Sequence, residues 1–191
     1  MPEARTFPAT SAPPPAAAPN AWARVLFLAD DGVAARAFDG ATAVTFDALG
    51  LAPCLRLRAD DATERAAAYA SVAGRTLLLT ALDLRLPDIP WVLGYANRRR
   101  RAAVVSIARL RDPRDDATTI RRARNVAAHE RGHLQGLSHC RDADCVMRSA
   151  NAPGILDGRG DAPCARCSRA LLRRDAWVRN LRRWLPGRER R

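Results

Sequence analysis

The stretch HERGHLQGLSHC, residues 129–140, contains all three histidines of the 191-residue chain. His129 and His133 are four residues apart, and on a helix this spacing places both imidazoles on one face, one turn apart. Gly136 permits a sharp change of direction, because it can adopt a positive φ that residues with a Cβ rarely adopt. The chain can then bring His139 back to the first two histidines. The stretch therefore predicts a helix that ends at a three-histidine cluster.

Three histidines in this pattern are typical of a zinc site. Zinc prefers four ligands in tetrahedral geometry, and three protein ligands leave one position for water, as in catalytic sites. Glu130 follows His129 directly and carries the group needed to take a proton from that water. We therefore predict attack of zinc-activated water on a carbonyl, with Glu130 as the general base that then protonates the leaving amine. The alternative is a set of surface histidines that bind no metal.

The four cysteines that follow the three histidines form two short-spaced pairs, Cys140 with Cys145 and Cys164 with Cys167. Two such pairs separated by a loop are the pattern of a closed tetrathiolate zinc site. Two disulfides or a redox CxxC are the alternatives, but disulfides need an oxidising compartment and nothing in the sequence indicates export. Consecutive residues of an extended segment point to opposite sides, so His139 can face one zinc while Cys140 faces another.

Charge and composition restrict the partners and the compartment. The formal net charge is +12, and the basic residues are all arginine. Runs of charge such as residues 98–101 and 121–124 are usually solvated faces, so nucleic acid is the less favoured partner. No apolar run could span a membrane, and residues 1–21 lack the pattern of a secretory signal, so we expect a cytoplasmic protein. We also expect a monomer. We predict Cys54 to be a buried small apolar residue.

Strand and helix patterns alternate before the histidines. Strands are expected at residues 22–30, 54–58, 75–84, 91–98 and 102–110, and helices at residues 33–50 and 60–74. A long helix should follow and end near Gly136, with Asp115, Asp116 or Thr118 at its N-cap. Residues 138–163 read as a loop. A final helix at residues 164–185 should pack its apolar face on the core, through Leu171, Val178, Leu181 and Leu185.

This order of elements predicts an α/β (α+β) fold in one compact domain. Adjacent strands that close an alternating strand–helix series imply a mixed sheet with helices against it. We place the domain at residues 22–186, after a disordered Pro/Ala-rich segment at residues 1–21 and before a basic tail at residues 187–191.

The motif HERGHLQGLSHCRDADCVM, residues 129–147, together with CARC at residues 164–167, resembles the archaemetzincin family of metzincin zinc peptidases. A weaker resemblance covers roughly residues 76–167. It implies a metzincin-like fold with a mixed twisted sheet, an active-site helix and a C-terminal zinc-bound subdomain. It also implies two zinc ions per chain and a methionine, Met147, beneath the catalytic zinc. The implied ligands are His129, His133 and His139 for the catalytic zinc, and Cys140, Cys145, Cys164 and Cys167 for the structural zinc.

We therefore expect a zinc-dependent metallopeptidase that acts on a peptide or protein substrate, with Glu130 as its general base. The alternative is a catalytically weak or inactive zinc protein that binds nucleic acid or an acidic partner through its arginine-rich surface. An intact Glu130 argues against this alternative, because a purely structural metal site does not need it. The sequence offers no obvious group to stabilise an oxyanion, and Tyr95 is the only candidate that we can name.

Overall fold

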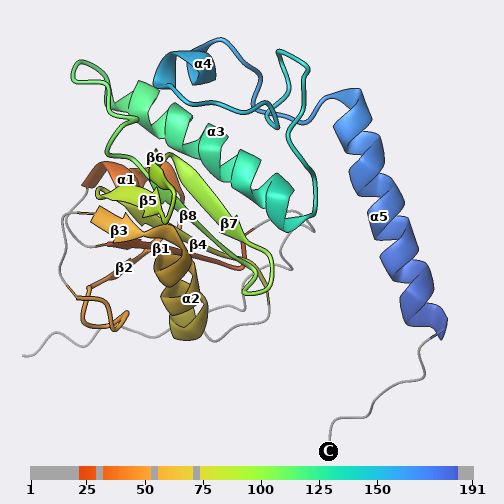
Figure 1. The fold of residues 1–191 in the computed structure, drawn as a ribbon, viewed down its shortest axis with the longest axis horizontal. Coiled ribbons are helices and arrows are strands. Elements are labelled where there is room, and N and C mark those ends of the chain that lie inside the picture. Colours follow the sequence, from red (N-terminus) through yellow and green to blue (C-terminus); the bar gives the residue numbers. More distant parts are fainter. Residues whose placement is uncertain (1–21, 29–31, 53–55, 71–73, 185–191) are drawn as a thin grey trace, which may run out of the picture.

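The computed structural model describes residues 22–28, 32–52, 56–70 and 74–184 (Figure 1). Cys54 lies outside the described residues. The strands are β1 (Arg24–Leu28), β2 (Thr42–Val44), β3 (Arg56–Arg58), β4 (Thr76–Thr80), β5 (Asp83–Leu86), β6 (Ile89–Val92), β7 (Gly94–Asn97) and β8 (Ala102–Ser106). The helices are α1 (Gly32–Ala37), α2 (Ala59–Ala70), α3 (Asp116–Leu134), α4 (Pro153–Asp157) and α5 (Ala165–Trp184).

The main sheet has the strand order β2-β1-β4-β8-β7. Its first four strands are parallel, and β7 is antiparallel to β8 at the edge. Every residue of β4 and β8 is buried, as is typical of parallel strands that are covered on both faces. Figure 1 shows α2 on one side of this sheet and α3 on the other. A smaller sheet has the order β3-β5-β6. The predicted α/β fold with a mixed sheet is confirmed.

Neighbouring residues of β4 supply two separate hydrophobic clusters. Leu77 and Leu79 pack with the apolar residues of α3, whereas Leu78 packs with those of α2. This follows from the alternation of side chains along a strand. The buried α3 residues in the first cluster are Ala123, Val126 and Ala127, and Ile120 and Leu134 pack against them. Burial of this stripe fixes α3 against the sheet, and the histidines follow directly at its C-terminal end.

Both ends of α3 have the features that the sequence predicts. Asp115 is the N-cap, and its carboxylate accepts hydrogen bonds from the backbone N–H groups of Ala117 and Thr118, at 3.0 and 2.9 Å. The Thr118 hydroxyl and these N–H groups lower the pKa of Asp115. Gly136 has φ +86°, a conformation that favours glycine, and it turns the chain out of the helix towards His139.

Several predicted elements before and after α3 are wrong in extent. The helix expected at residues 33–50 ends at Ala37, and Gly40, with φ +71°, turns the chain into β2, which pairs with β1. Each of the two long strands predicted at residues 75–84 and 91–98 belongs to two sheets. The first divides into β4 and β5, while the second contains the end of β6 and then β7. The loop predicted at residues 138–163 contains α4, which begins at a proline.

The final helix exists as predicted, but its packing differs. Its first turns contact the cysteine segment through Cys167, Ala170 and Leu171. Further along, α5 extends away from the rest of the fold (Figure 1), and Leu172 is 66% exposed. The side chains of the predicted face beyond residue 175 lie outside the described part. Among the described helices, none is both long and apolar enough to cross a membrane.

Candidate active site

The three histidines meet beside the C-terminal end of α3. One ring nitrogen from each of His129, His133 and His139 lies within 4.8 Å of the other two. The Nε2 atoms of His129 and His133 are 3.0 Å apart. Two nitrogens bound to one tetrahedral zinc, each at about 2.0–2.1 Å, would be separated by roughly 3.3 Å. The donor set and its spacing therefore fit a single zinc ion.

Backbone carbonyls orient the two histidines of α3. Nδ1 of His129 lies 2.8 Å from the carbonyl oxygen of Val146, and Nδ1 of His133 lies 2.9 Å from that of Leu137. If each Nδ1 carries the proton and donates it, Nε2 is left with a lone pair for a metal. Burial lowers the pKa of His129 to about 4, so its imidazole is neutral at physiological pH, as metal binding requires.

The four cysteines form a second cluster next to the first. Their sulfur atoms all lie within 4.8 Å of one another, and all four cysteines are free. The Sγ–Sγ distance is 3.8 Å both from Cys140 to Cys164 and from Cys145 to Cys167. Two thiolates bound to one tetrahedral zinc at about 2.3 Å would be separated by roughly 3.8 Å, whereas a disulfide requires about 2.05 Å. The spacing fits a metal and excludes disulfides in this state.

Charged and polar groups surround the cysteine cluster unequally. The guanidinium of Arg166 donates to the sulfur of Cys140 at 3.1 Å. The backbone N–H of Asp142, followed by Arg166, lowers the pKa of the Cys140 thiol to about 6, whereas burial raises the pKa of Cys145 and Cys167. Arg166 therefore offsets part of the negative charge that four thiolates would bring to one metal.

One short segment connects the two clusters. The backbone N–H of Cys140 donates to the carbonyl of Met147 at 2.8 Å, and Cys140 forms an isolated bridge with Arg148. Met147 is fully buried, and a Cβ on Gly132 of α3 would lie only 2.2 Å from its sulfur. The methionine therefore packs directly against the helix between His129 and His133, and the same segment holds the cysteine site.

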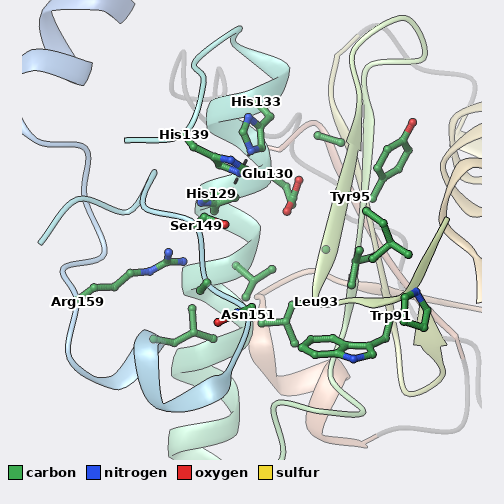
Figure 2. Close-up of a pocket in the computed structure, with 18 residues that line it drawn as sticks. Trp91, Leu93, Tyr95, His129, Glu130, His133, His139, Ser149, Asn151 and Arg159 are labelled. Carbon is green, nitrogen blue, oxygen red and sulfur yellow. Dashed lines mark hydrogen bonds between the residues drawn. The ribbon is translucent and has the colours of Figure 1, made fainter. Parts of the chain in front are cut away.

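Glu130 lines the same cleft as the histidines. It is only 6% exposed, and no residue that the structure describes donates a hydrogen bond to its carboxylate. Burial raises its pKa to about 8, against the opposing charge of Arg159. Figure 2 shows the carboxylate pointing from α3 across the cleft, towards the strand that carries Tyr95. A metal ion beside it would favour the ionised form.

The cleft has a volume of about 670 Å³ and two chemically different ends. The histidines and Glu130 form one end. Trp91 lies at the other end, with Leu93 between it and the upper part of the cleft (Figure 2). The guanidinium of Arg109 lies 4.7 Å from the centre of the Trp91 ring and forms a bidentate pair with Asp83, at 2.8 and 2.9 Å. The ion pair with Asp83 therefore holds Arg109 against the Trp91 ring, and this contact fixes the aromatic wall of the cleft.

Arg159 is a buried cation in the wall of the cleft that sequence reasoning missed. It is 8% exposed, and its Nε donates to the side chain of Asn125 at 2.7 Å. A second nitrogen donates to the carbonyl of Arg148, and Asn125 in turn donates to the carbonyl of Gly160 at 3.2 Å. Arg159 therefore connects α3 to the segment that follows Met147. Arg159 is part of no recognisable sequence motif. The only signal in the sequence was that it is a lone arginine in a Gly/Asp-rich loop.

Tyr95 lines the cleft but is not oriented as an oxyanion donor. Its hydroxyl points away from Glu130 and the histidines in Figure 2. Its ring packs against the hydrophobic cluster on the α2 side of the sheet. This geometry does not support the role that the sequence left open for Tyr95.

The fold and the two clusters together define an α/β protein built around a metal-binding helix. The model of Peptidase family M54 matches residues 57–173, which include every residue of both clusters. The chain therefore belongs to peptidase family M54, the archaemetzincins.

Similar proteins agree with this family. The chain is 40% identical over 99 residues to an archaemetzincin of Methanopyrus kandleri, over 52% of this chain and 56% of that protein. It is 39% identical over 114 residues to an archaemetzincin of Thermococcus kodakarensis, over 57% of this chain and 59% of that protein. The matches thus span a little over half the length of these relatives. The crystal structure of the Methanopyrus kandleri archaemetzincin superimposes with a TM-score of 0.63 at 26% identity, covering 83% of this chain and 97% of that one.

Proposed function

We propose that this protein is a zinc-dependent metallopeptidase that hydrolyses peptide bonds in the cleft between α3 and β7. The observation that carries the proposal is the convergence of three histidine nitrogens within 4.8 Å, next to a buried carboxylate that lines the same cleft. Membership of a peptidase family supports the same reaction. Burying a carboxylate costs free energy, so a buried Glu130 is expected to have a role. A non-enzymatic zinc protein would give it none.

His129, His133 and His139 would hold the zinc, which supplies an acidified water and polarises the carbonyl of the substrate. Glu130 accepts the proton of the attacking water and passes it to the leaving amine. Its carboxylate can do both because its oxygens face the cleft and accept no hydrogen bond from another described residue.

The edge strand β7 would bind the substrate backbone. It pairs with β8 on one side, and no described strand pairs with its other side, which borders the cleft. An extended peptide can add to such an edge through main-chain hydrogen bonds. This arrangement would place a peptide bond beside Glu130 without requiring a particular sequence.

The apolar end of the cleft would select one substrate side chain. Its walls carry Trp91, Leu93, Val126 and Leu156. An aromatic or long aliphatic side chain would bury its surface there, and this burial contributes about 25 cal/mol per Å². We therefore propose peptides with a large apolar residue next to the cleaved bond as the preferred substrates.

The cysteine cluster would bind a second, structural zinc. Four thiolates close the coordination sphere, and three of the four side chains are buried, so no position remains for a substrate. We also propose one catalytic domain at residues 22–186, flanked by residues 1–21 and 187–191. We also propose a monomer, since the three histidines, Glu130 and the four cysteines all come from one chain.

Cleavage profiling with a proteome-derived peptide library tests the activity. The wild type should cut zinc-dependently, whereas Glu130→Gln should keep its zinc and lose cleavage by about 10²–10⁴-fold. Glu64→Gln is the matched control, because Glu64 is exposed on α2 and, among the described residues, forms an ion pair with Arg100 far from the cleft. Equal cleavage by the wild type and Glu130→Gln would exclude Glu130 as the base.

A further inference from the structure

Gly94 is the first residue of β7 and lies opposite the catalytic helix. It pairs with Val105 of β8, and its face of the strand is the one that meets α3, since Tyr95 packs on the opposite side with the α2 cluster. Its φ is not positive, unlike those of Gly40, Gly50, Gly74 and Gly136. The backbone conformation therefore does not require glycine here, and glycine in a strand normally weakens it. Some other constraint must favour glycine at this position.

The constraint is space. A Cβ on Gly94 would lie 2.7 Å from Oε1 of Glu130, 2.9 Å from its Cγ and 2.8 Å from Cγ1 of Val126. Real Cβ atoms essentially never come within 3.0 Å of another heavy atom. Glu130 and Val126 are 6% and 4% exposed and both line the cleft, so the Glu130 carboxylate can avoid the contact only by moving further into the cleft, away from its present position. By contrast, a Cβ on Gly154 or Gly158 would meet nothing within 4 Å.

We propose that Gly94 is a positioning residue for catalysis, because the missing side chain leaves the space that the Glu130 carboxylate occupies. Gly94 contributes no group to the reaction. It lets β7, the strand proposed to bind the substrate backbone, approach α3 closely while the carboxylate stays between them. Any larger residue must displace either the carboxylate or the strand. The first is the proposed base, and the second would hold the peptide bond that is cleaved. The catalytic part of this inference rests on the proposed peptidase function, whereas the packing part does not.

The size of the displacement indicates the size of the effect. To bring the 2.7 Å contact to an ordinary 3.4 Å, one group must move by about 0.7 Å. A misplacement of about 1 Å at a reacting centre can cost about 100-fold in rate. We therefore expect Gly94→Ala to lower kcat by about 10–100-fold and to change KM by less than about threefold, with two zinc ions per chain retained. Gly154→Ala should leave both constants unchanged, and a Gly94→Ala variant with kcat within twofold of wild type would overturn the proposal.

A second measurement tests the contact without using activity. In the wild-type background, Gly94→Ala should lower Tm by about 4–8 °C, since overpacking destabilises a core. In a Glu130→Ala background the methyl group enters the space left by the glutamate, so the same change should lower Tm by less, and the remaining fall should come from the contact with Val126. An equal fall in both backgrounds would contradict the proposal. If Gly94→Ala folds only when Glu130 is absent, the contact is supported even more strongly.

The two measurements separate failure of this inference from failure of the proposed function. If the wild type cleaves no peptide but the fall in Tm caused by Gly94→Ala depends on Glu130, then Gly94 does make room for the carboxylate and the peptidase assignment is wrong. If the wild type cleaves peptides and Gly94→Ala cleaves them equally well, the assignment stands and the positioning role is wrong.

Discussion

The histidine and cysteine clusters lie on one continuous segment but are built for opposite purposes. Three histidine donors face a cleft of about 670 Å³, and His139 is exposed. Four cysteine donors pack among Leu137, Val146 and Met147, and three of the four are buried. Both donor sets have the spacing of a tetrahedral zinc site. Access and ligand number therefore distinguish the two sites, whereas the geometry of the donors does not.

The comparison also shows how one site can depend on the other. His139 and Cys140 are adjacent, and Cys140 is bound to the segment of Met147 through a backbone hydrogen bond of 2.8 Å. The carbonyl of Val146, from the same segment, orients His129. The closed site is thus expected to hold the ligands of the open site in place, and removal of the closed site should damage both.

The largest expected effect follows from removal of a buried thiol. Cys145 is fully buried, so Cys145→Ser should abolish the structural zinc and lower Tm by roughly 10 °C or more, because structural zinc contributes folding free energy directly. Zinc affinity at the histidines should fall as well, since His139 loses its anchor. Elemental analysis and thermal unfolding measure both effects. Cys54→Ser, outside the four-cysteine pattern, is the control for zinc content, and two zinc ions retained in Cys145→Ser would refute the second site.

A smaller effect should be confined to the open site. Trp91→Ala removes the aromatic wall of the cleft but touches neither cluster. We expect kcat/KM to fall by about 10–100-fold for peptides with a large apolar side chain and by less than about threefold for those with alanine at the same position. Leu172→Ala, which removes an apolar side chain 66% exposed on α5, should change neither value. An equal loss for both peptides would mean that Trp91 does not select the substrate.

The smallest effect concerns Asp157, which attaches α4, one wall of the cleft, to α3. Its carboxylate accepts from Arg121 at 2.7 Å and from Arg122 at 2.6 and 2.9 Å, and Arg122 contributes most to lowering its pKa to about 2. The side chain is 34% exposed, so we expect Asp157→Asn to cost only about 1 kcal/mol at pH 7.

The pH dependence of this difference has a definite sign. Because the pKa of Asp157 is lower in the folded protein than its ordinary 3.8, its contribution is full above about pH 5 and is lost as the pH falls through about 2. The difference in unfolding free energy between wild type and Asp157→Asn should therefore be about halved at pH 3. Urea unfolding at pH 7 and pH 3 measures it, with Asp161→Asn as the control. A difference that grows at low pH would be inconsistent with the ion pair.

The sequence predicted the clusters better than the elements around them. Spacing alone brought His129, His133 and His139 together, because two ligands share a helical turn and Gly136 reverses the chain. The cap at Asp115 was also recognisable, since its carboxylate bonds the nearby N–H groups of its own helix. These features depend on contacts that are local in sequence, and local contacts leave a readable pattern.

The features that the sequence did not predict depend on contacts between distant segments. The run at residues 42–44 is a strand only because β1 pairs with it. Arg159 finds Asn125 thirty-four positions away, and Gly94 meets Glu130 across two different elements. A lone arginine or a glycine within a strand gives a weak signal of a close approach, but not of its partner.

Controlled removal of zinc tests the distinction between the two sites most directly. Protein purified without added metal would be titrated with a chelator while zinc release, peptide cleavage and unfolding are followed together. We predict two zinc ions per chain, of which the first is released quickly with all of the cleavage activity and little loss of structure. The second should leave slowly and together with unfolding. Release of both ions at one rate, or activity that persists after the first ion has left, would contradict an open catalytic zinc beside a closed structural one.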